Sequence, residues 1–239
     1  MTKKQIILIV LVVTLLFWVD PIYAGPGGYV AKGLFKTFWG KLLLAALVII
    51  FLPLILYIRF VEYRKARKIK KILNQLAVNN KALSWLQLEK EFSNIIRRVY
   101  NAWTNEDMAE VKNYVNHWFW QNQQLVYLEQ WKRENLKNVS RLQTLGKMKP
   151  VYLELTSEEN WEGSRIAVCI ELEVEDYLMD RDTKQIVQGK DGYQDVEYVW
   201  FFEYNNGQWL LDDIQEGALS LQFAKMKDVI PEGFVVFVR

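Results

Sequence analysis

Residues 196–214 read VEYVWFFEYNNGQWLLDDI, and this stretch decides the fold class. Apolar and polar residues alternate on both sides of Asn205-Asn206-Gly207, where Asn and Gly tolerate the positive φ angles of a tight turn. The pattern predicts an antiparallel hairpin with large aromatic rings on one face. Apolar residues also alternate over 151–155 and 166–174, which predicts two earlier strands, the second with an acidic outer face.

The residues before these strands have helical spacing. Apolar side chains recur every three or four positions from Trp85 to Trp103. Thr104 and Asp107 resemble a capping box, which predicts a second helix through Trp118. A third helix is expected over about 121–136. Helices followed by an antiparallel meander indicate an α+β domain with three helices packed on one face of the sheet.

The first 80 residues indicate attachment to a membrane. Residues 1–24 have a basic start and an apolar run, and they fit either a cleaved signal peptide or a retained first anchor. Residues 25–40 are rich in glycine and aromatics and are expected to form an extracytoplasmic loop. Residues 41–60 are predicted to form a transmembrane helix, because 42–58 carry no charge. Residues 61–80 are interpreted as a basic juxtamembrane linker.

The distribution of charge predicts the orientation. Basic residues concentrate after the apolar segment, so the C-terminal side is expected to face the cytoplasm. Six of them are predicted to contact anionic lipid headgroups. They are Arg64, Lys65, Arg67, Lys68, Lys70 and Lys71. Residues 72–239 carry 18 Lys or Arg and 26 Asp or Glu, and this acidic balance argues against a nucleic-acid partner.

Several segments together resemble a known family. The first is Phe92–Trp103 with the following Thr104-Asn105-Glu106-Asp107. The others are residues 134–139, residues 151–155, and residues 197–202 with 207–209 and Ile214. They resemble the C-terminal domain of the mitochondrial inner-membrane import-motor tether, the Tim forty-four-like family within the nuclear-transport-factor-two-like superfamily.

The matched region is about 84–216, and it predicts a Tim forty-four-like domain over 81–216 with residues 217–239 as an extension. Residues 1–71 have no Arg- and Ser-rich transit peptide, so the chain looks like a bacterial relative with its own anchor in the inner (plasma) membrane. The resemblance implies a cone-shaped α+β fold with a curved sheet and an apolar pocket, which binds lipid or protein and is not catalytic.

These observations favour a membrane-anchored cytoplasmic module that tethers a protein partner or lipid, in protein transport or in assembly of a membrane complex. The pocket candidates are aromatic residues that either line a cavity or fill a solid core, together with the single histidine. They are Trp118, Trp120, Trp200, Phe202, Trp209 and His117. The alternative is an isomerase or dehydratase in which His117 works with a carboxylate. We expect no metal and no cofactor, because the chain has one Cys and one His, and Asp212-Asp213 fits a solvated acidic pair.

Overall fold

The computed structural model describes residues 37–78, 81–156 and 161–231. The predicted signal or first anchor (1–24) and residues 25–36 of the predicted loop (25–40) lie outside these residues, whereas residues 38–40 of that loop belong to the first described helix. The chain divides into two compact units, Met1–Phe60 and Val61–Arg239, and each is described by itself.

The first described element is the helix α3, Phe38–Leu76, which has 39 residues and contains Pro53. The part of α3 before residue 61 exposes large apolar side chains such as Ile50, Phe51 and Leu54. This helix is long and apolar enough to cross a membrane. The segment interpreted as a juxtamembrane linker continues the same helix as far as Leu76, and it belongs to the second unit.

Two helical segments follow: a 3-10 helix, Lys81–Leu83, and α4, Trp85–Asn105. Ser84 caps the start of α4, and its side chain accepts a hydrogen bond from the Gln87 N–H. The predicted cap at Thr104 is wrong, because Thr104 lies inside α4 and its hydroxyl donates to the Tyr100 carbonyl. Asp107 instead caps a short 3-10 helix, Met108–Val111.

The predicted second helix through Trp118 is also wrong. The chain turns after the 3-10 helix, and the Asn116 N–H donates to the carbonyl of Leu211. Helical structure resumes in three consecutive segments: α5, His117–Gln121; a π-helix, Asn122–Leu128; and α6, Glu129–Arg133. These segments start earlier and end earlier than the third helix expected over about 121–136.

The sheet has four strands in the order β1-β2-β3-β4, all antiparallel. They are β1, Leu136–Glu154; β2, Arg165–Asp180; β3, Ile186–Asn205; and β4, Gln208–Glu216. The predicted hairpin is confirmed: Asn206 and Gly207 form its turn with φ values of 52° and 79°. The α+β class is therefore confirmed.

β1 begins at Leu136, well before the strand predicted from Val151. Residues 141–147 are mostly exposed and do not alternate in polarity, so the pattern gave no signal for a strand. Pro150 is tolerated inside β1 because β1 lies at an edge of the sheet, where a missing N–H need not break the ladder.

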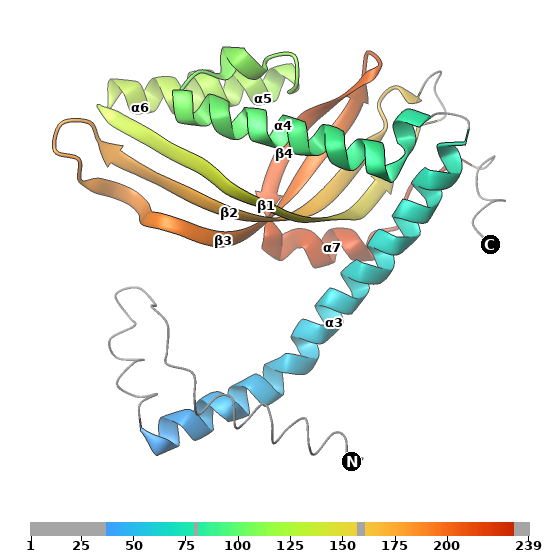
Figure 1. Cartoon of the computed structure of the whole chain (residues 1–239), viewed down its shortest axis with the longest axis horizontal. Helices are drawn as coiled ribbons and strands as arrows, with labels where there is room; N and C mark the ends of the chain where they lie inside the picture. Colours follow the sequence, from blue (N-terminus) through green and yellow to red (C-terminus); the bar gives the residue numbers. More distant parts are fainter. Residues whose placement is uncertain (1–36, 79–80, 157–160, 232–239) are drawn as a thin grey trace. The chain divides into compact units, whose positions relative to one another are not determined.

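Helices cover both faces of the sheet (Figure 1). α4, α5 and α6 lie over one face, whereas α7, Ser220–Lys225, lies against the other. Between α4 and the sheet, the core contains Phe92 from α4, Trp200 from β3 and Trp209 from β4. On the α7 face, Ala167 and Cys169 are fully buried, and Glu175 further along β2 is also buried. The predicted acidic outer face of β2 is therefore not exposed to solvent at these three positions.

Candidate functional site

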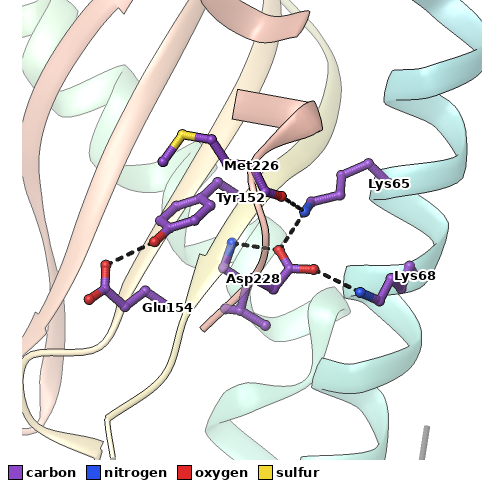
Figure 2. Close-up of polar contacts among 7 residues, drawn as sticks. Lys65, Lys68, Tyr152, Glu154, Met226 and Asp228 are labelled. Carbon is purple, nitrogen blue, oxygen red and sulfur yellow. Dashed lines mark hydrogen bonds and ion pairs between the residues drawn. The ribbon is translucent and has the colours of Figure 1, made fainter. Parts of the chain in front are cut away.

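The C-terminal segment after α7 is joined to α3 through Asp228. The Asp228 carboxylate is 1% exposed and forms two ion pairs, at 2.8 Å to Lys65 Nζ and 3.2 Å to Lys68 Nζ (Figure 2). It also accepts a hydrogen bond from the backbone N–H of Leu153. Lys65 Nζ donates in addition to the carbonyl of Met226. One buried carboxylate thus joins α3, β1 and the C-terminal segment.

Backbone pairing fixes the position of Asp228. The Val229 N–H donates to the Leu153 carbonyl, and the Val229 carbonyl accepts from the Leu155 N–H, at 3.0 and 2.8 Å. The segment therefore runs parallel to the end of β1. Lys65 and Lys68 are three residues apart, so they lie on the same side of α3 and both reach the carboxylate.

The six predicted headgroup contacts separate into two groups. Lys65 and Lys68 bind Asp228, and Lys70 Nζ lies 4.5 Å from the centre of the Trp85 ring. The side chain of Lys65 is only 9% exposed. The other three basic residues are exposed on α3. They are Arg64, Arg67 and Lys71.

The pocket candidates from the hairpin fill the core. Trp200, Phe202 and Trp209 are buried, and the Phe202 ring stacks on Phe92 with 3.9 Å between centroids. The Trp209 ring meets Phe92 edge-on at 5.9 Å. This packing favours the solid-core alternative over a cavity lining for these three rings.

The other three pocket candidates are consecutive or nearly consecutive residues of α5, and Trp120 among them is half-buried. His117 is exposed and stacks on Trp120 at 5.9 Å between centroids. Trp118 is about half exposed, and its indole N–H donates to Asp212 Oδ1. The imidazole thus lies at the surface and not inside an enclosed pocket, so its placement gives no support to the isomerase hypothesis.

A polar cluster lies under α7 on the other face of the sheet. Ligand atoms of Glu62, Cys169 and Glu197 lie within 4.8 Å of one another, a spacing that could hold a metal ion. The Cys169 thiol donates to Glu197 Oε1, and burial together with this bond raises the pKa of the thiol. Ser220 donates to Glu62, and the Lys149 ammonium lies 3.9 Å from the same carboxylate. A protonated thiol and an adjacent ammonium both oppose cation binding.

A cavity of about 370 Å³ lies between α4 and the sheet. Its walls include Arg97 and Tyr100 from α4, Arg141 from β1 and Tyr193 from β3. These residues were not among the site residues predicted from the sequence. One sequence pattern could have indicated part of the cavity lining. The polar residues Arg97, Asn101 and Thr104 follow one another at spacings of four and three, which places them on one side of a helix. Nothing in the sequence indicated that Arg141 lies in a strand facing it.

No protein-family model matches the chain, and no curated protein matches it. Among solved structures, the chain is similar to the intermembrane space region of the chloroplast protein ARC6, with a TM-score of 0.37 and 7% sequence identity. The match covers 53% of this chain and 94% of the other. A likeness at this level supports no conclusion about function.

Proposed function

We propose that this chain is a membrane-anchored binding module that holds a folded α+β domain at the membrane, where it tethers a protein partner or lipid. The observation that carries the proposal is the composition of α3. Its first part exposes apolar side chains over a length sufficient to cross a bilayer, and its last part buries Ile69, Ile72 and Leu73 in the domain core. A single helix thus belongs to both an anchor and a domain.

We propose further that the domain faces the cytoplasm of a bacterial cell. The basic residues that follow the apolar segment support this orientation through the positive-inside rule. Arg64, Arg67 and Lys71 are the candidates for headgroup contact, because these three residues are exposed on α3. Involvement in protein transport or membrane-complex assembly is the corresponding proposal for the cellular role.

The family proposal is a Tim forty-four-like domain with the cone of the nuclear-transport-factor-two-like superfamily. It is supported by the aromatic hairpin of β3 and β4, whose rings pack beneath α4. In this proposal the domain is a binding module without catalytic residues.

A topology reporter fused after Arg239 tests the anchor and its orientation. We expect a cytoplasmic signal from membrane fractions. Changing Arg64, Arg67 and Lys71 to Gln should reduce that signal, because it removes the exposed part of the charge bias without breaking the Asp228 ion pairs.

The matched control changes Lys132, Arg133 and Lys137 to Gln, which removes the same charge from exposed or half-exposed positions beyond the apolar segment. This control should leave the signal unchanged. A soluble protein, or an extracytoplasmic signal from the unmodified chain, would contradict the proposal. Crosslinking in native membranes followed by mass spectrometry then identifies the bound protein or lipid.

A further inference from the structure

The cavity between α4 and the sheet has two guanidinium groups and no carboxylate among its lining residues. Two of its other polar groups are engaged elsewhere: the Asn101 amide donates to Glu110, and the Thr104 hydroxyl donates to the carbonyls of Tyr100 and Ser140. On α4, Arg97, Asn101 and Thr104 follow one another at spacings of four and three, so one side of the helix faces the cavity. Arg141 faces them from β1 and Tyr193 from β3. Three elements therefore converge on one volume of about 370 Å³.

The guanidinium groups of Arg97 and Arg141 retain N–H donors that a ligand could engage. Arg141 Nη1 contacts Glu175 Oε2 at 3.0 Å, which engages one of its five N–H donors. Arg97 is exposed and has no ion pair among the described residues. The compact unit 61–239 carries 24 Lys or Arg and 27 Asp or Glu, so the two arginines place positive charge at this cavity in a unit whose net charge is slightly negative.

Apolar groups also line the cavity. Tyr100 is buried, and its ring packs edge-on against Trp103 with 5.1 Å between centroids. Leu142 and the ring of Tyr193 supply further apolar surface. The volume is near the lower end of the range for small-molecule sites, about 300–1,000 Å³. It suits a compact molecule better than a lipid with its acyl chains.

We propose that this cavity binds a small organic oxyanion, a carboxylate or phosphate monoester carried on a compact aromatic or aliphatic body. The oxyanion is held by the guanidinium groups of Arg97 and Arg141, which match planar and tetrahedral oxyanions through paired N–H donors. The body of the ligand lies against Tyr100 and Tyr193. This site is additional to the proposed tethering function and does not depend on the membrane anchor.

Isothermal titration calorimetry on the full chain in a neutral detergent tests the proposal with three soluble probes: phenyl phosphate, benzoate and inorganic phosphate. We expect saturable binding of phenyl phosphate or benzoate, and weaker binding of inorganic phosphate, which has no ring. Arg97→Gln should weaken binding about tenfold, as expected for loss of a charge-assisted hydrogen bond. Arg141→Gln should have a similar effect.

Arg98→Gln is the matched control, since Arg98 neighbours Arg97 but lies 4.6 Å from the Tyr114 ring, away from the cavity lining. It should leave the affinity unchanged. Arg97→Gln is the decisive variant, because Arg141 also pairs with the nearly buried Glu175 and its loss could affect folding. The proposal is overturned if no soluble probe binds saturably, or if Arg98→Gln weakens binding as much as Arg97→Gln. Arg97-dependent binding of phosphatidylglycerol in nanodiscs without binding of a soluble probe would also overturn it, in favour of a lipid headgroup.

Discussion

Replacing Leu73 by Ala tests whether the last part of α3 belongs to the folded domain. The Leu73 side chain is 0% exposed and lies in the same core cluster as Leu88, Phe92 and Trp209. Truncating a fully buried leucine costs about 2–5 kcal/mol, because apolar contacts are lost and a cavity remains. A domain of this size has a total stability of about 5–15 kcal/mol, so the loss is a large fraction of it.

The assay is urea unfolding of the compact unit 61–239, followed by tryptophan fluorescence. With a denaturant slope of about 2 kcal/mol per M, a loss of about 3 kcal/mol lowers the urea midpoint by about 1.5 M. Lys71→Ala is the control on the same helix, because Lys71 is exposed, and it should change the free energy of unfolding by less than about 0.5 kcal/mol.

Equal midpoints for Leu73→Ala and Lys71→Ala would refute this reasoning. Residues 61–76 would then form a linker outside the core, as the sequence pattern suggested. The same result would remove the main support for a helix shared by the anchor and the domain.

Three further predictions concern the sheet. Trp209→Ala should lower the free energy of unfolding by about 3–5 kcal/mol, whereas the exposed Gln208→Ala should be neutral in the same urea assay; equal midpoints would place the ring outside the core. Cys169 is buried, and burial raises the pKa of its thiol, so a maleimide should add mass to the protein only after denaturation. Rapid labelling of the native protein would contradict the packing of Cys169 under α7. Asp176 is partly exposed, but desolvation by the surrounding protein raises the pKa of its carboxyl, against a smaller opposing effect of the Ser140 hydrogen bond. The contribution of this carboxyl to stability therefore falls as pH rises through the folded-state pKa. Asp176→Asn should therefore raise the urea midpoint at about pH 7, and the gain should disappear towards about pH 4. A gain in midpoint that does not depend on pH would show that the pKa of Asp176 is not raised.

The sequence by itself determined the elements whose signals are local. Alternation around Asn206 and Gly207 predicted the β3–β4 hairpin, because strand period and turn chemistry depend on neighbouring residues. The spacing of apolar residues predicted α4 in the same way, and the uncharged run 42–58 predicted a helix capable of crossing a membrane. The order of these elements was sufficient for the α+β class.

Only the tertiary structure decided which surfaces these elements bury. The basic stretch around Lys65 and Lys68 has the composition of a headgroup-binding segment, yet Asp228, about 160 residues away, pairs with both lysines. Likewise, Arg97 and Arg141 line one cavity only because β1 starts at Leu136 and passes beneath α4. Periodicity identifies the face of an element that is apolar or charged, but the partner of that face depends on contacts between residues distant in the chain. Those contacts form only when the whole domain packs.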